Sequence, residues 1–119
     1  MQPRNKARKI AGFIREKKGA DVLLLNIKKI SSIADYILLC SAESAMQVQA
    51  IAVHVIEGLR KKEVFPLSVE GLETARWALV DYGDVVVHIF VEPVRSFYDL
   101  EGLWADAPRV EIEEKKVSG

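Results

Sequence analysis

The chain has 119 residues, and half of them are hydrophobic, which predicts a single domain with one continuous core. It has no run of about 18 uncharged apolar residues, and its first fifteen residues carry five basic side chains without a long apolar stretch, so we expect neither a membrane span nor a signal peptide. We therefore expect a cytoplasmic protein. A single cysteine, Cys40, excludes an internal disulfide, and without the Cys/His spacing of a zinc site we expect no metal and no cofactor.

Charged residues are unevenly distributed along this chain, although its formal net charge is zero. Residues 1–29 carry nine basic and two acidic side chains, whereas residues 63–106 carry two basic and nine acidic ones. Such asymmetry indicates partners of opposite charge and fast association, and it says nothing about the fold. The alternative is that two solvated faces merely differ in sign.

The first third of the chain predicts a helix followed by two buried strands. Apolar residues at i, i+3, i+4 and i+7 indicate an amphipathic helix at about 4–18, which we expect Gly19 to cap. Residues 22–25 and 36–40 are apolar runs without alternation, which is typical of strands covered on both faces. Cys40 ends the second run and is interpreted as a small buried hydrophobe.

The middle of the chain predicts a second helix and an edge strand. Ser44 and Gln47 have the spacing of a capping box, and an apolar stripe continues from them into a helix at about 45–62. Residues 66–70 suit a short edge strand, because Pro66 cannot donate a hydrogen bond to a neighbouring strand.

A β-hairpin is predicted from two strand-like runs at 77–80 and 85–91. The turn between them, at 81–84, is rich in residues that tolerate positive φ. Alternation places His88 on the same face as its neighbours two residues away, where a buried and satisfied histidine is favoured over a catalytic one.

The C-terminal part of the chain predicts a short helix and then a tail. Pro93 can begin a helix, so residues 94–104 predict one or two helical turns, and residues 111–119 lack apolar periodicity and indicate a frayed tail. The order of elements predicts an α/β (α+β) domain at 1–107, with a mixed sheet flanked by helices, and a polar tail at 108–119.

The second half of the chain also carries a dense family motif. The motif residues are Glu70, Gly71, Trp77, the run 81–90, Arg95, Phe97, Tyr98, Leu100, Glu101, Leu103, Trp104, Asp106 and Ala107. Through these residues the chain resembles the ribosomal silencing factor family, also called the Iojap family. Further matches upstream, at 30–36 and 47–52, extend the resemblance to about residues 5–108.

The resemblance implies a fold related to nucleotidyltransferases and a function without chemistry. It implies that the chain binds large-subunit ribosomal protein fourteen, so that its bulk blocks joining of the small subunit and represses translation. The chain departs from the family pattern at two places. Its turn at 41–44 reads Ser-Ala-Glu-Ser, followed by Met46, where Ser-Gly-Thr-Ser and an arginine are usual, and Ala75 replaces a usual glycine.

The resemblance and the acidic half together place the expected docking surface on the hairpin and the C-terminal motif. Trp77 and Tyr82 are common types of interface anchor, although Trp77 can instead fill the core. Asp81 and Asp84 can pair with basic residues or cap their own turn, and for Trp104 inward packing is favoured. The expected partner-binding residues are Trp77, Leu79, Asp81, Tyr82, Asp84, Glu92, Tyr98 and Glu101.

Two other classes of function compete with this hypothesis. A nucleotidyltransferase needs carboxylates on a divalent metal beside a phosphate-binding turn, but Glu43 in that turn would repel phosphate, so we expect no catalytic residues. RNA binding by the basic N-terminal helix is the other alternative. Only Phe13 offers stacking there, so we expect at most auxiliary contact with ribosomal RNA. The oligomeric state stays open, with a homodimer of the free protein as one alternative.

Overall fold

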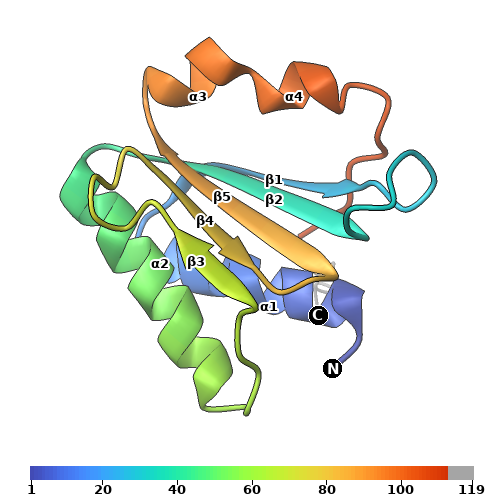
Figure 1. The fold of residues 1–119 in the computed structure, drawn as a ribbon, viewed down its shortest axis with the longest axis horizontal. Coiled ribbons are helices and arrows are strands. Elements are labelled where there is room, and N and C mark those ends of the chain that lie inside the picture. Colours follow the sequence, from blue (N-terminus) through green and yellow to red (C-terminus); the bar gives the residue numbers. More distant parts are fainter. Residues whose placement is uncertain (113–119) are drawn as a thin grey trace, which may run out of the picture.

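The computed structural model describes residues 1–112 and shows an α+β domain built on a five-stranded mixed sheet (Figure 1). In this part of the chain no helix is long and apolar enough to span a membrane. The elements in chain order are α1 (Pro3–Glu16), β1 (Ala20–Asn26), β2 (Tyr36–Ala42), α2 (Ala45–Arg60), β3 (Ser68–Glu70), β4 (Trp77–Asp81), β5 (Val85–Val91), α3 (Val94–Tyr98) and α4 (Leu100–Leu103).

The strand order across the sheet is β1-β2-β5-β4-β3. The central strands β2 and β5 are parallel, with Leu38 opposite Val87, and the other neighbouring pairs are antiparallel. Every residue of β2 is buried, which confirms the prediction of a strand covered on both faces. Cys40 lies in this strand, and burial raises the pKa of its thiol to about 12, as suits a small core residue.

The helices form a layer on each side of the sheet (Figure 1). On one side, α1 and α2 bury apolar stripes that include Ile14 and Ile51 against the sheet. On the other side, Leu100 and Trp104 pack against a second cluster that contains Phe90. Burying one large side chain of this kind contributes about 1.5–3 kcal/mol, so both layers hold the sheet. The inward packing favoured for Trp104 is therefore confirmed.

The start of α2 is fixed by the capping residues that the sequence predicts. Ser44 Oγ accepts a hydrogen bond from the Gln47 backbone N–H at 3.2 Å, and Gln47 Oε1 accepts one from the Glu43 N–H at 2.6 Å. The Gln47 amide also donates to the carbonyls of Lys17 and Lys18, at 3.3 and 3.1 Å. One side chain therefore joins the beginning of α2 to the end of α1.

The C-terminal cap of α1 differs from the prediction. The helix ends at Glu16, and the left-handed residue is Lys18, with φ of 64°, instead of Gly19. The Gly19 N–H donates to the Ile14 carbonyl at 2.9 Å, and a Cβ at this position would collide with the Ile14 side chain. Glycine is required here for close packing rather than for a left-handed backbone.

Residues 108–112 also depart from the expectation of a tail that begins at 108. The Asn26 N–H donates to the Pro108 carbonyl at 2.9 Å, and the Val110 N–H donates to the Leu24 carbonyl at 2.9 Å, so this segment pairs with the outer edge of β1. Val110 and Ile112 pack against the core. Unpaired backbone groups at a sheet edge and alternating apolar residues explain the difference. The rest of the expected tail, 113–119, lies outside the described residues.

Candidate docking face

Three of the expected partner-binding residues share the face of the sheet that α3 and α4 cover in part. Trp77, Leu79 and Asp81 alternate along β4, where they lie opposite Phe90, His88 and Val86 of β5. All three side chains are half-buried. Because β-strand side chains alternate, the hairpin presents these residues to one side and sends those between them into the α1–α2 core.

The aromatic patch, which we define as Trp77, Phe97 and Tyr98, lies where β4 meets α3. The rings of Trp77 and Tyr98 are 4.8 Å apart between centroids, and Phe97 packs edge-on against Tyr98 at 5.1 Å. Phe97 is 80% exposed and Tyr98 is 53% exposed. An apolar hollow of about 600 Å³ opens between them, and its lining residues are Thr74, Arg76, Trp77, Pro93, Val94, Phe97 and Tyr98.

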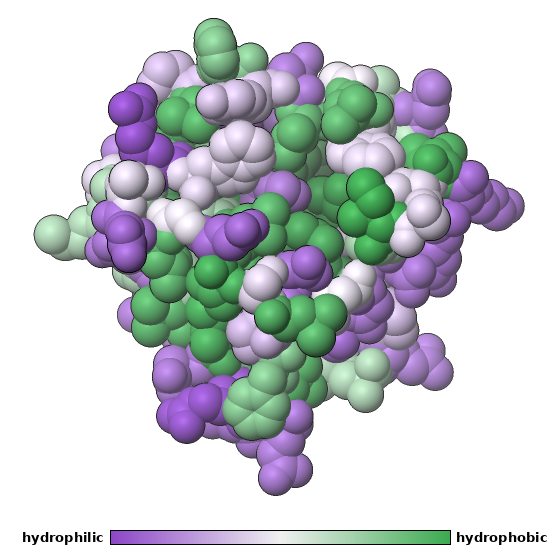
Figure 2. Space-filling model, in the orientation of Figure 1, coloured by the Kyte–Doolittle hydropathy of each residue, from purple (hydrophilic) through white to green (hydrophobic). Residues whose placement is uncertain are grey.

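The outer surface over α3 and α4 mixes hydrophobic and hydrophilic side chains (Figure 2). Leu103 is 69% exposed there, and Glu92, Asp99 and Asp106 are exposed as well. Large apolar side chains and carboxylates are therefore exposed side by side over these two helices.

His88 holds the indole of Trp77 in place. Its Nδ1 accepts a hydrogen bond of 3.0 Å from Trp77 Nε1, which requires a neutral ring. Burial lowers the pKa of His88 to about 4, and the nearby Asp81 carboxylate opposes part of that fall. The expected buried and satisfied histidine is thus found, and its role is to orient an aromatic side chain.

The acidic turn at 81–84 uses its carboxylates within the chain. Asp81 Oδ1 accepts from the Gly83 N–H at 2.7 Å, and Gly83 has the positive φ of 87° that suits glycine. Both Asp84 carboxylate oxygens accept hydrogen bonds from Lys6 Nζ, at 2.8 and 3.0 Å. The turn chemistry that the sequence suggested is present, and Asp84 is also tied to α1.

Tyr82, one of the expected partner-binding residues, lies on the opposite side of the hairpin from Trp77. It is 6% exposed and belongs to the core cluster beneath α1. Burial raises the pKa of its hydroxyl to about 12, and that hydroxyl has no hydrogen-bond partner among the described residues. An odd spacing of five residues separates the two rings, and odd spacings in a hairpin favour opposite faces.

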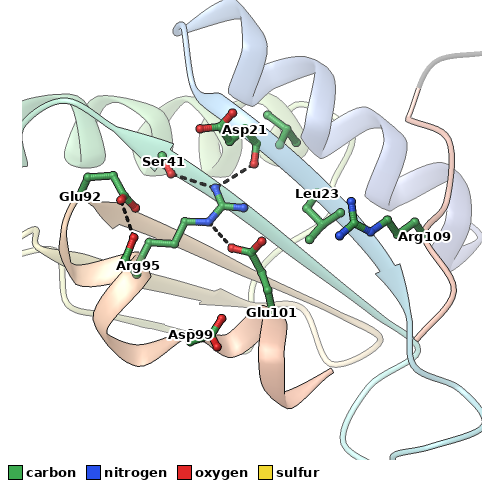
Figure 3. A pocket seen from close by; sticks show the side chains of 10 residues that line it. Asp21, Leu23, Ser41, Glu92, Arg95, Asp99, Glu101 and Arg109 are labelled. Atoms are coloured by element: carbon green, nitrogen blue, oxygen red, sulfur yellow. Dashed lines mark hydrogen bonds and ion pairs between the residues drawn. The ribbon is translucent and has the colours of Figure 1, made fainter. Parts of the chain in front are cut away.

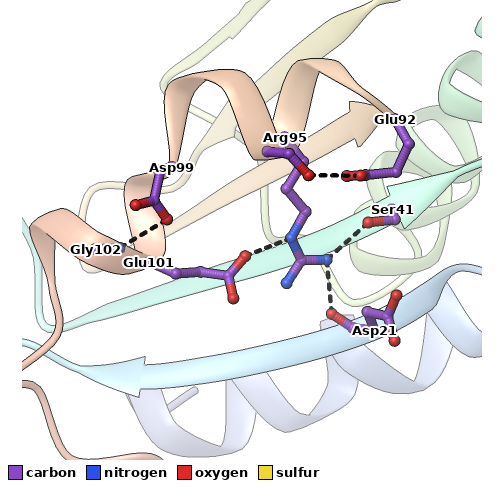
Figure 4. A network of polar contacts seen from close by, with 8 residues as sticks. Asp21, Ser41, Glu92, Arg95, Asp99, Glu101 and Gly102 are labelled. Carbon is purple, nitrogen blue, oxygen red and sulfur yellow. Dashed lines mark hydrogen bonds and ion pairs between the residues drawn. The ribbon is translucent and has the colours of Figure 1, made fainter.

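A buried arginine, which sequence reasoning used only as part of a motif, organises the other end of this face (Figures 3 and 4). The Arg95 network comprises Arg95, Glu101, Ser41 and the Asp21 carbonyl. Arg95 Nε donates to Glu101 Oε1 at 2.6 Å, and its Nη1 donates to Ser41 Oγ and to the Asp21 carbonyl, both at 2.8 Å. Glu101, expected to bind a partner, is therefore ion-paired inside the chain.

The Arg95 network borders a polar hollow of about 600 Å³ beside β1 (Figure 3). Glu92, another expected partner-binding residue, lines this hollow and accepts a hydrogen bond of 2.8 Å from the Ser96 hydroxyl. The sequence signal for this network was an arginine that precedes two aromatic residues in an acidic segment. Its partners could not be read from the sequence, because they come from β1, β2 and α4.

The turn at 41–44 offers little to a phosphate. The Glu43 and Gln47 N–H groups are both taken by side chains at the start of α2, and the Ser41 hydroxyl belongs to the Arg95 network. A phosphate-binding turn needs such donors to be available.

Comparison with known proteins identifies the family. The family model described as "Ribosomal silencing factor during starvation" matches residues 1–118. The chain belongs to the ribosomal silencing factor family. It is 47% identical to the ribosomal silencing factor RsfS of Halalkalibacterium halodurans over 100 residues, which cover 84% of this chain and 86% of that protein. Similarity also extends to the chloroplastic protein Iojap of Zea mays, at 28% identity over 87% of this chain and 45% of that one.

The fold of this silencing factor agrees with solved relatives. A crystal structure from Chromobacterium violaceum superposes with a TM-score of 0.86 and 30% sequence identity, covering 100% of this chain and 95% of that one. Membership confirms the resemblance drawn from the hairpin and C-terminal motif, and it assigns the chain to ribosome silencing and the regulation of translation.

Proposed function

We propose that this silencing factor docks on the large ribosomal subunit through large-subunit ribosomal protein fourteen, and that its bulk then blocks association with the small subunit. The aromatic patch is the observation that carries the proposal. Phe97 and Tyr98 are large and exposed, Tyr98 packs on Trp77, and Phe97 packs edge-on against Tyr98. They can therefore bury apolar area on a partner without a preceding rearrangement.

Charge supports a basic partner for this face. Ribosomal proteins are generally basic, and Glu92, Asp99 and Asp106 are exposed around α3 and α4. Carboxylates at the rim of an interface raise the association rate and fix register, while aromatic anchors supply most of the affinity. Leu79 and Asp81 extend the same face along β4 and are included in the proposed surface.

The outer side of α1 suits an auxiliary contact with ribosomal RNA. Arg4 and Lys9 are exposed on α1, and Lys17 and Lys18 are exposed directly after it, so they can neutralise phosphates without reading sequence. Phe13 is already packed against His54 at 5.5 Å, so base stacking is not part of the proposal. We also propose that the free protein can form a homodimer, in which the aromatic patches of the two copies cover each other.

We also propose that silencing in the cytoplasm requires no catalysis. An alternative nucleotidyltransferase activity would need a phosphate cradle at the turn before α2, where the Glu43 N–H is engaged by Gln47 and a carboxylate stands beside it. Steric blocking needs only a shaped surface, which the aromatic patch and its acidic surroundings supply.

Co-sedimentation followed by subunit joining tests the proposal. The purified protein should pellet with large subunits, not with small subunits, and should lower the yield of joined ribosomes in proportion to the bound fraction. Large subunits that lack protein fourteen should not bind the silencing factor. Equal pelleting with both subunits, or joining that proceeds at full yield on saturated large subunits, would contradict the proposal.

A further inference from the structure

The Arg95 network joins the C-terminal helices to two strands that are distant in sequence (Figure 4). Arg95 lies in α3 and is 8% exposed, Glu101 lies in α4, Ser41 lies in β2, and the Asp21 carbonyl belongs to β1. A buried guanidinium is costly unless its N–H groups are paired. Here the pairs hold α3 in one orientation above the sheet.

The Arg95 network also affects the aromatic patch, because the two exposed rings of the patch follow Arg95 closely in the chain. Phe97 and Tyr98 complete α3, and Asp99 then takes a left-handed backbone with φ of 45° that separates α3 from α4. A helix of five residues has little stability of its own. Its orientation therefore depends on tertiary anchors, of which Arg95 is the most deeply buried polar one.

We propose that Arg95 is a positioning residue for docking, and that Glu101 acts through Arg95 instead of touching the partner. This inference rests on the proposed function. The Arg95 network sets where Phe97 and Tyr98 stand relative to Trp77, and so presents the aromatic patch in its binding geometry. An arginine suits this task because its rigid fork reaches separate acceptors at once, which a lysine ammonium on a flexible stem does not reproduce.

Double-mutant cycles on the full chain test this mechanism, with large-subunit affinity as the readout. Arg95→Met should weaken binding at least tenfold, and Arg95→Lys should recover part of that loss. Glu101→Gln should weaken binding in the parent but not in Arg95→Met. Tyr98→Ala should likewise cost less affinity in the Arg95→Met background, because the ring has already lost its placement.

Arg109→Met is the matched control, because it removes one positive charge from the lining of the same hollow without cutting the Arg95 network. It should bind like the parent. Amide hydrogen exchange of each free variant gives a second readout, in which Arg95→Met should expose the amides of 94–103 while those of β2 and β5 stay protected. This pattern also shows that the variant remains folded.

The two proposals fail in different ways. Additive losses for Arg95→Met with Glu101→Gln and with Tyr98→Ala would overturn the positioning role, as would unchanged exchange at 94–103 in Arg95→Met. If the parent itself bound no large subunits, the proposed function would fail, and the positioning of α3 by Arg95 would still be decided by the exchange comparison.

Discussion

The Trp77 indole and the His88 imidazole form a 3.0 Å hydrogen bond across β4 and β5, and this bond needs the imidazole to be neutral. Burial lowers the pKa of His88 to about 4, so protonation is more costly in the folded state than in the unfolded one. The stability supplied by the neutral ring is therefore complete above about pH 6.5 and is lost as the pH falls from there to about 4.

Replacing His88 with glutamine should remove this pH dependence, because a glutamine carbonyl can accept the indole N–H and does not titrate. Between about pH 7 and pH 4 we expect the parent to lose roughly 3 kcal/mol more unfolding free energy than His88→Gln. Denaturant unfolding at several pH values measures the difference. Identical pH profiles for the two proteins would show that His88 does not titrate below its ordinary range.

Lys6 and Asp84 should contribute to stability rather than to docking. Their ion pair joins α1 to the hairpin turn at 2.8 Å with both side chains mostly buried, so Lys6→Met leaves a carboxylate without its partner. We expect a loss of about 2 kcal/mol in unfolding free energy, part of which Lys6→Met combined with Asp84→Leu restores. Thermal unfolding measures both variants. A single Lys6→Met variant as stable as the parent would contradict the role of the pair.

Removing the Tyr82 hydroxyl should be neutral or stabilising. This oxygen is buried without a hydrogen-bond partner, and burial of an unpaired polar group costs about 1–3 kcal/mol. Tyr82→Phe keeps the ring that packs in the core and should raise the unfolding free energy by up to about 1 kcal/mol, with unchanged binding to large subunits. A folded Tyr82→Phe variant that no longer binds would place the hydroxyl at the interface after all.

Two exposed phenylalanines allow a matched test of the aromatic patch. Phe97 is 80% exposed in the patch, whereas Phe65 is 61% exposed before β3. Phe97→Ala should weaken large-subunit binding by about tenfold or more, since a central anchor is worth at least about 1.4 kcal/mol, and should leave stability within about 0.5 kcal/mol. Phe65→Ala should preserve binding. Equal effects of the two substitutions on affinity would move the docking surface away from α3.

The charge of Asp81 should act on the rate of association. Asp81→Asn retains the side-chain oxygen that accepts from the Gly83 N–H, so the turn survives while the charge is lost. We expect slower association at low salt and a weaker salt dependence, because charges at an interface rim steer encounters. Stopped-flow binding at several salt concentrations measures this. Glu111→Gln, a charge removed beside α1, is the control and should retain the parent's salt dependence.

Most of the elements and the family motif could be read from the sequence, because they depend on local periodicity. The stripe containing Ile10 and Ile14, the capping pair Ser44 and Gln47, and the hairpin turn each fall within a few residues of one another. Interactions of this range are present in any conformation that keeps the helix or turn. The prediction of helices and strands therefore succeeded with small shifts of their ends.

The tertiary structure, and not the sequence, decided which residues lie together on the candidate docking face. Trp77 and Tyr82 are close in the sequence, but the pleat of the hairpin places them in opposite layers. Glu101 contacts Arg95 only after α4 folds back over the sheet. Ala75, which stands where the family usually has glycine, has a positive φ of 54°, and no local sequence pattern predicted this backbone conformation. Each of these features depends on contacts between distant segments, and a single sequence does not specify which of its many distant pairs will form.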